Sequence, residues 1–154
     1  MRINAAAFDR HHIQVFREFD ESSPAVCADR HKVLQILINL LRNAKHAMDE
    51  VNECERRMVI RVAMTSPDWV KISVTDNGMG IPAEHVPKIF NHGFTTKKEG
   101  HGFGLHSGAN AAKEMGGRLT GRSDGPDRDA EFTLELPTTA AGREQEHLAT
   151  QKSI

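Results

Sequence analysis

The chain has 154 residues, a length that fits a single domain. Hydrophobic residues make up 38% of it and charged residues 27%, which is enough apolar material for a packed core and too little bias for a disordered chain. The formal net charge is -1, so the protein offers no broad basic surface and nucleic acid is not an expected partner.

Membrane and secretion signals are not found in the sequence. No apolar run approaches the roughly 20 residues that a membrane-spanning helix needs, and residues 1–12, MRINAAAFDRHH, do not resemble a signal peptide. Cys27 and Cys54 have no metal-ligand spacing, so we interpret them as reduced thiols. These features predict a cytoplasmic segment without membrane contact, and they leave open whether a longer parent protein is membrane-anchored.

The first elements are a strand over 11–19 and a long helix that starts near Asp29 and runs towards Val51 or Cys54. One face of this helix is apolar and another is rich in amides. The apolar face is predicted to consist of Leu34, Leu37, Leu41, Ala44 and Met48, widened by Val33, Leu40 and Ala47. The polar stripe consists of Gln35, Asn39, Asn43 and His46.

The remaining elements alternate short strands with helices. Strands are predicted over 58–65, 70–76, 118–123 and 130–137, helices over 83–90 and 105–115, and a mobile glycine-rich loop over 91–104. This order predicts an α/β (α+β) two-layer sandwich, in which a mixed, mostly antiparallel sheet is covered by helices on one face. The domain would span residues 1–137, followed by a polar, disordered tail over 138–154.

Asn39 and Asn43 are four residues apart and share one helix face. A carboxamide oxygen is a hard neutral ligand that suits Mg²⁺, which usually keeps waters and binds together with substrate phosphates. The alternative interpretation is that both asparagines are solvated residues of an amphipathic helix.

Two further segments suggest a nucleotide. Asp76 ends a strand directly before the turn Asn77 to Gly80, so its carboxylate can accept a hydrogen bond from an exocyclic amine, although a plain strand-to-helix turn explains the same residues. The segment GHGFGL, residues 100–105, opens a helix and can present backbone N–H groups to phosphate, although a flexible hinge is the alternative.

Together these segments resemble the ATP-binding (Bergerat) fold shared by gyrase B, Hsp90, MutL and sensor histidine kinases. LINLLRNAKHAM resembles the N box of this family, DNGMGI the G1 box, KIFNHGFTTK the F box and GHGFGLH the G2 box. The resemblance covers about residues 29–137 and implies an ATP-binding domain with Mg²⁺ as cofactor and a flexible lid over the nucleotide.

The resemblance also implies roles for single residues. Asn43 would bind Mg²⁺, Asp76 the adenine amine, and Lys97 a β- or γ-phosphate, while His46 would lie near the phosphates; Asn43, His46 and Lys97 are thus the candidate catalytic residues. The residues implied to contact or shape the ATP site are Asn39, Asn43, Asp76, Gly78, Gly80, Ile81, Phe90, Phe94, Thr95, Lys97, Gly100, Gly102, Gly104 and Leu105.

Asn39 distinguishes between the branches of this family. In the ATPase relatives the corresponding residue is a glutamate that activates water, and an amide cannot act as a general base at neutral pH. Asn39 and the phenylalanines of the F box favour a histidine kinase. The alternatives are an ATPase of the gyrase–Hsp90–MutL type, a serine kinase of the anti-sigma class, and a nucleotide-binding module without chemistry.

Two features depart from the family pattern. Ala130 stands where relatives usually carry a small hydroxyl residue that helps the aspartate bind adenine. His11 and His12 lie in a predicted strand, so neither fits a phosphoacceptor histidine, which sits on a helix. The expected partners are therefore a separate helix-pair phosphoacceptor domain of the same kinase, within a homodimeric parent, and a response regulator downstream. His85, His92, His101 and His106 lack zinc-site spacing, and we interpret them as solvated or close to phosphate.

Overall fold

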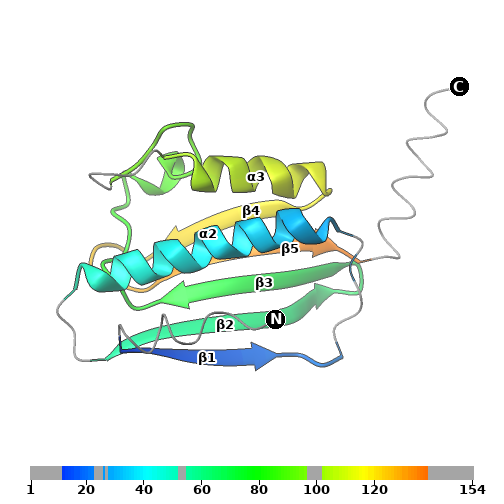
Figure 1. Ribbon diagram of the computed structural model, residues 1–154, viewed down its shortest axis with the longest axis horizontal. Helices are drawn as coiled ribbons and strands as arrows, with labels where there is room; N and C mark the ends of the chain where they lie inside the picture. Colours follow the sequence, from blue (N-terminus) through cyan, green and yellow to red (C-terminus); the bar gives the residue numbers. More distant parts are fainter. Residues whose placement is uncertain (1–11, 23–25, 27, 52–54, 97–101, 139–154) are drawn as a thin grey trace, which may run out of the picture.

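The computed structural model describes residues 12–22, 26, 28–51, 55–96 and 102–138. Its strands form one five-stranded sheet in the order β1-β2-β3-β5-β4 (Figure 1). The strands are β1 (Ile13–Phe19), β2 (Arg56–Ser66), β3 (Trp69–Asp76), β4 (Arg118–Ser123) and β5 (Ala130–Pro137). β1 pairs with β2 in parallel and the other pairs are antiparallel, so the predicted mixed, mostly antiparallel sheet is confirmed.

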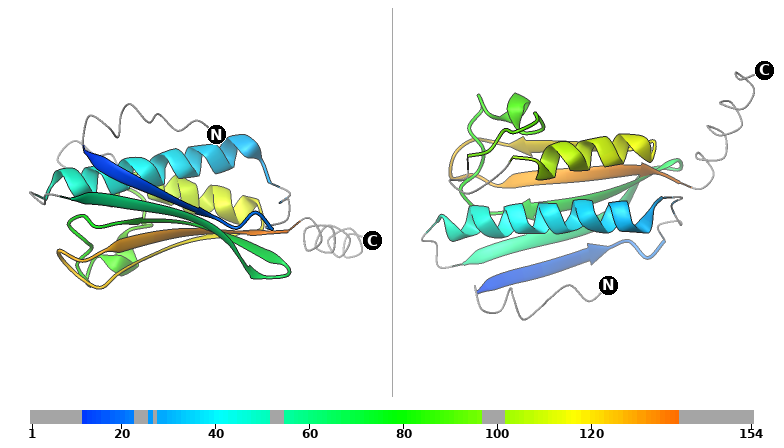
Figure 2. Two further views of the ribbon diagram at one scale, coloured as in Figure 1. Left: turned by 90° about the horizontal axis from the view of Figure 1, so that it is seen from below. Right: turned by 45° about the horizontal axis from the view of Figure 1, so that its top comes forward.

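Helices α2 (Arg30–Asp49) and α3 (Gly104–Glu114) pack side by side on one face of this sheet, as both views in Figure 2 show. Asp29 caps α2 as predicted, because its carboxylate accepts hydrogen bonds from the backbone N–H groups of His31 at 2.8 Å and Lys32 at 3.2 Å. α3 ends before Gly116, whose φ of 71° lies in the left-handed region that favours glycine. The two-layer sandwich is therefore confirmed.

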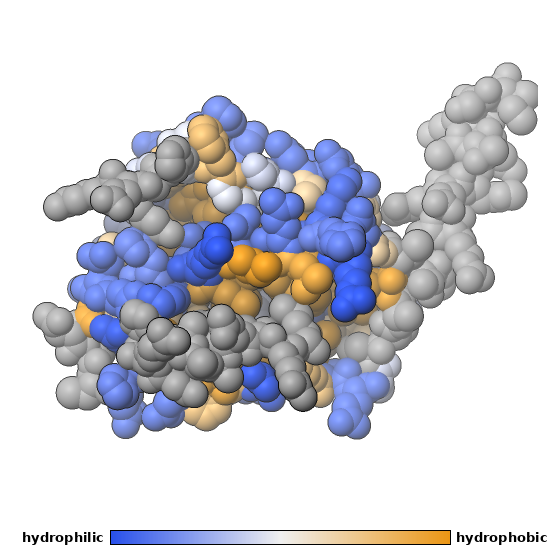
Figure 3. Space-filling view, in the orientation of Figure 1, coloured by the Kyte–Doolittle hydropathy of each residue, from blue (hydrophilic) through white to orange (hydrophobic). Residues whose placement is uncertain are grey.

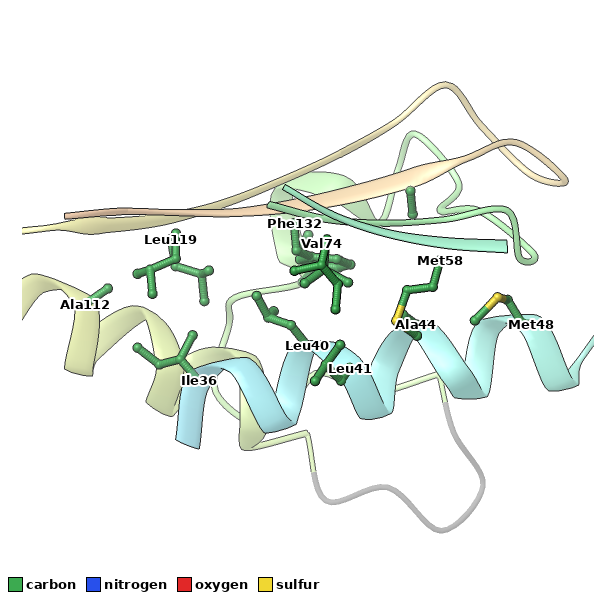
Figure 4. Close-up of a cluster of buried hydrophobic side chains, with 14 of the residues drawn as sticks. Ile36, Leu40, Leu41, Ala44, Met48, Met58, Val74, Ala112, Leu119 and Phe132 are labelled. Carbon is green, nitrogen blue, oxygen red and sulfur yellow. The ribbon is translucent and has the colours of Figure 1, made fainter. Parts of the chain in front are cut away.

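The core lies between the helices and the sheet, where the labelled side chains of α2 point towards the strands (Figure 4). The prediction for the apolar face of α2 was partly wrong, since Leu34 and Leu37 are only half-buried while Ile36 is 1% exposed. The reason is the position of α3. Gly108 of α3 lies so close that a β-carbon there would be 3.7 Å from the Ile36 side chain, so the buried arc of α2 turns towards α3. The residues of α2 that are buried are Ile36, Leu40, Leu41, Ala44 and Met48.

Two predicted helix boundaries are corrected. α2 ends at Asp49 and not at Val51 or Cys54, and the ion pair of Asp49 with Arg56 of β2 at 3.0 Å holds this helix end beside the next strand. The predicted helix over 83–90 is a single 3-10 turn, η1 (Val86–Lys88). Pro87 lies within this turn and has no N–H to continue a helix.

The opposite face of the sheet is polar. Ion pairs cross it between neighbouring strands, joining Arg61 to Glu18 and both Lys71 and Arg122 to Glu131. On the helix-bearing side, Figure 3 shows mostly hydrophilic residues around a hydrophobic area near the centre. Among the helices of the described ranges, none is both long and apolar enough to cross a membrane.

Candidate functional site

A cavity of about 560 Å³ opens between α2, the end of β3 and the start of α3, with β5 forming part of its wall. It gathers residues that are far apart in the sequence. Its lining consists of Asn39, Arg42, Asn43, His46, Ala47, Asp76, Met79, Gly80, Ile81, Pro82, His85, Ile89, Phe94, Thr95, Thr96, Gly102, Phe103, Gly104, Leu105, Ala130 and Phe132.

Asp76 lies at one end of the cavity, where β3 stops. Its side chain is buried, with the residue 2% exposed, and its Oδ1 accepts a hydrogen bond from the Gly78 N–H at 3.0 Å. Burial raises the pKa of the Asp76 carboxyl to about 7; the Gly78 N–H lowers it and the charge of Asp129 raises it further. This carboxyl group can therefore change its protonation state near neutral pH.

The glycine turn after Asp76 is shaped by two close contacts. A β-carbon at Gly78 would lie 2.5 Å from the backbone carbonyl carbon of Ala47, and the Met79 N–H donates to the Ala47 carbonyl at 3.0 Å. Gly80 has a φ of +68°, and a β-carbon there would lie 2.0 Å from the Gly125 carbonyl oxygen. Gly80 lines the cavity, whereas Gly78 packs behind the lining against α2. The turn therefore fixes Asp76 and Met79 against the helix.

The polar stripe of α2 faces the cavity through Asn39, Asn43 and His46. The Asn39 side-chain NH₂ donates to the Gly104 carbonyl at 3.4 Å, which connects α2 to the first residue of α3. His46 Nε2 lies 3.8 Å from the Glu50 carboxylate. Asn39 is thus engaged in positioning α3.

The other end of the cavity is formed by residues 94–96 and 102–105. α3 starts there without a side-chain cap, so the first N–H groups of the helix, which have no acceptor within it, are available to a ligand. Gly102 has a φ of +68° and packs against the backbone of Gly93 and Phe94, where a β-carbon would lie 2.4 Å from the Gly93 carbonyl carbon. Lys97 and Gly100, two of the predicted phosphate-binding residues, lie outside the described residues.

Phe90, like Gly78, does not line the cavity; it packs against the hydrophobic core. Its carbonyl oxygen lies 3.0 Å from His106 Nδ1 of α3. Phe94, the second phenylalanine of this segment, does line the cavity and contacts His85 edge to face. Within the described ranges, no three His, Cys, Asp or Glu side chains gather as a metal site would require.

Sequence reasoning missed several lining residues. Arg42 was detectable, because it follows Asn39 by three residues and precedes His46 by four, which places all three on one helix face. Met79, Ile89 and Phe132 carried no signal, because apolar residues that line a pocket have the same sequence pattern as core residues. The other missed residues are Ala47, Pro82, Thr96 and Phe103. Ala130, which the sequence placed where relatives help to bind adenine, and His85, which it interpreted as solvated or close to phosphate, also line the cavity.

The cavity on this α/β sandwich combines a buried carboxylate at a strand end, an amide-bearing helix face and an uncapped helix start. The sequence profile of the family described as "Histidine kinase-, DNA gyrase B-, and HSP90-like ATPase" matches residues 28–140, and the chain belongs to this family. Within the family, the chain is similar in sequence to sensor histidine kinases and in structure to their catalytic domains.

Sensor protein FixL of Bradyrhizobium diazoefficiens is 32% identical over 125 residues, covering 81% of this chain and 24% of FixL. Sensor histidine kinase ZraS of Escherichia coli (strain K12) is 36% identical over 125 residues, covering 81% of this chain and 26% of ZraS. The chain thus spans about a quarter of the length of these curated relatives.

Solved structures show the same architecture. The nucleotide-free catalytic domain of histidine kinase ThkA superposes with a TM-score of 0.74 at 29% identity, covering 87% of this chain and 86% of that domain. The mycobacterial sensor histidine kinase MprB superposes with a TM-score of 0.72 at 22% identity, covering 86% of this chain and 87% of that one, and supports the fold alone.

Proposed function

We propose that this domain binds Mg·ATP in the cavity, with adenine at Asp76 and the phosphates between Asn43 and the start of α3. The geometry of α2 supports this orientation. Ala47 contacts the turn after Asp76, and Asn39 contacts Gly104 at the start of α3. Ala47 and Asn39 are eight positions apart on the helix, which corresponds to about 12 Å at 1.5 Å per residue, a length that suits a nucleoside and its phosphates.

Mg²⁺ fits the same end of the cavity. Asn43 lines it with a neutral amide, a ligand that suits Mg²⁺ when phosphates and waters supply the remaining oxygens. The ion would neutralise phosphate charge during transfer. In Asn43→Ala we expect ATP to lose more affinity than adenosine, and calorimetry with both ligands tests this. Equal losses would exclude Asn43 as a metal ligand.

The proposed reaction is transfer of the γ-phosphoryl group to a histidine on a separate helix-pair domain. The observation that carries it is the position of Asn39, an amide bonded to Gly104 where a water-activating carboxylate would have to stand. Among the described lining residues, the only carboxyl group is Asp76, at the adenine end. An imidazole nitrogen needs no such base: its lone pair attacks the γ-phosphorus, and the bond to the β-phosphate oxygen breaks as ADP leaves.

The proposed partners follow from this reaction. They are the phosphoacceptor helix pair of a homodimeric parent kinase and a response regulator that receives the phosphoryl group from it. Lys97 and the backbone of Gly100 to Gly104 would contact the phosphates, with His46 close by. Because ATP is supplied in the cytoplasm, we place the domain there, and we propose neither a nucleic-acid nor a membrane contact for it.

Incubation with γ-labelled ATP tests the proposal. Alone, the domain should release phosphate very slowly and acquire almost no label. Addition of a helix-pair fragment that bears the phosphoacceptor histidine of the parent should produce acid-labile label on that fragment. Rapid phosphate release by the domain alone would indicate an ATPase, and ATP binding without transfer to the fragment would indicate a module without chemistry.

A further inference from the structure

Arg42 is a cation at the margin of the nucleotide cavity. It is exposed, yet it lines the cavity beside Asn43. Of the described lining residues, it is the only lysine or arginine. A guanidinium keeps its charge at every physiological pH, so Arg42 gives this part of the cavity a permanent positive charge.

No carboxylate in the described part of the chain pairs with Arg42. Four other arginines do form such pairs, namely Arg56, Arg61, Arg118 and Arg122. On α2 the positions three and four residues from Arg42 hold Ile38, Asn39, Lys45 and His46, none of them acidic. The surface of α2 around Arg42 therefore offers this guanidinium no counter-ion.

The position of Arg42 along α2 places it closer to the phosphate end than to the adenine end. It is three residues, about 4.5 Å of helix rise, from Asn39, whose side chain contacts Gly104 at the start of α3. It is five residues, about 7.5 Å, from Ala47, which contacts the turn after Asp76. Side chains on a helix lean towards its N-terminus, so the long Arg42 side chain is expected to lean towards the Asn39 end of α2.

We propose that Arg42 binds the terminal phosphate of the nucleotide, an inference that rests on the proposed function of the cavity. A guanidinium can donate two parallel hydrogen bonds to phosphate oxygens, and a partly enclosed site strengthens them. Arg42 is thereby the counter-ion of the γ-phosphate and distinguishes ATP from ADP. It adds positive charge where the phosphoryl group leaves, beside the Mg²⁺ that Asn43 would bind.

The test compares three ligands and four proteins. Calorimetry measures the affinities of ATP, ADP and adenosine for the wild type, Arg42→Gln, Arg42→Lys and the control Arg17→Gln. Arg17 is also exposed and lies on the edge strand β1, outside the lining of this cavity, so its substitution changes the net charge equally without touching the cavity. Thermal unfolding verifies that all four proteins are folded.

We expect Arg42→Gln to weaken ATP binding about tenfold, the scale of a lost charge-assisted pair. The affinity of Arg42→Gln for ADP should fall by a smaller factor, and its affinity for adenosine by less than twofold. The ATP affinity of Arg42→Lys should lie between those of the wild type and Arg42→Gln, because lysine keeps the positive charge but lacks the two parallel donors of a guanidinium. Arg17→Gln should match the wild type.

Three results would overturn the inference: an equal loss for all three ligands in Arg42→Gln, no loss for any, or normal ATP affinity with slow transfer to the helix-pair fragment. The last would place Arg42 in contact with the partner domain. Wild-type affinities for ATP and adenosine test nucleotide binding in the cavity separately, so a wild type that binds both leaves this part of the proposed function intact whatever the variants show.

Discussion

Asp76 is a single residue on which both stability and the proposed recognition of adenine depend. Burial raises the pKa of its carboxyl from 3.8 to about 7, so the folded protein retains a proton that the unfolded chain has already lost between these values. Its partner in the β3–β5 register is Ala130, whose methyl group cannot donate a hydrogen bond to the carboxylate.

The pH dependence of stability follows from that shift. Where the folded state binds more protons than the unfolded state, stability falls as pH rises, so the Asp76 contribution should decline from about pH 4 to pH 7 and then level off. Urea unfolding at several pH values, with Asp76→Asn as the protein that lacks this titration, isolates the effect. Ala130→Thr adds a hydroxyl donor beside Asp76 and should lower the pH at which the Asp76 contribution levels off. Ala130→Val, which has the same shape without the hydroxyl, should not. If the free energy of unfolding depended on pH in the same way in the wild type and in Asp76→Asn, the raised pKa of Asp76 would be contradicted.

Asp76→Asn should also change which base the cavity prefers. Oδ1 of Asp76 accepts from the Gly78 N–H, and an asparagine can keep this bond only by directing its NH₂ towards the cavity. That group opposes the amine of adenine but can donate to the carbonyl oxygen of hypoxanthine. We expect adenosine to lose about tenfold in affinity, the scale of a hydrogen bond to a charged group, while inosine gains. Equal losses for both nucleosides in calorimetry would mean that the second carboxylate oxygen does not contact the base.

At the scale of elements, Gly78 in the turn after β3 and Gly104 at the start of α3 differ in how strictly their surroundings require a glycine. A β-carbon at Gly78 would lie 2.5 Å from the Ala47 backbone, whereas one at Gly104 would lie 3.5 Å or more from the Asn39 side chain. Gly78→Ala should therefore destabilise the fold by about 1–3 kcal/mol, because the turn must move away from α2. Gly104→Ala, at the first position of α3, should be neutral or stabilising by up to about 1 kcal/mol. Urea unfolding of both variants measures this, and equal destabilisation would mean that the contact with Ala47 is relieved without cost.

The elements themselves were largely predictable because each has a local signal. Asp29 marks the start of α2 and the glycines after Met115 mark the end of α3, and both signals depend only on neighbouring residues. The burial of Ile36 was not predictable, because it depends on where α3 lies beside α2. The early end of α2 depends likewise on a distant partner, Arg56 of β2.

The candidate site was predicted by the spacing of its motifs, and its contacts were not. The boxes identified Asn39, Asn43 and Asp76, which the cavity does bring together. A motif does not reveal, however, which part of the fold each of its residues contacts. Gly78 packs against α2 and Phe90 against the core, and both lie outside the cavity lining. Arg42 was overlooked because a charged residue on a helix is most often simply solvated.

On the scale of the whole molecule, the cavity joins parts that the chain connects only indirectly. Asp76 ends β3, Ala130 starts β5, and Asn43 and Gly104 belong to the two helices. A nucleotide that contacts all four elements binds only when they are assembled, so it should stabilise the complete fold. At a concentration of 100 times its dissociation constant, a ligand adds about 2.7 kcal/mol to the free energy of unfolding.

Amide hydrogen exchange distinguishes this global effect from a local one. Val74 of β3 and Ile60 of β2 are both buried in the core, and neither lines the cavity. If the two layers unfold as one cooperative unit, saturating Mg·ATP should slow exchange at both amides by the same factor, about a hundredfold for 2.7 kcal/mol. GTP at the same concentration should slow neither, because guanine presents a carbonyl to Asp76 where adenine presents its amine. If protection increased only in α2 and β5, the nucleotide would stabilise a separate unit around the cavity, and β1 and β2 would unfold independently of it.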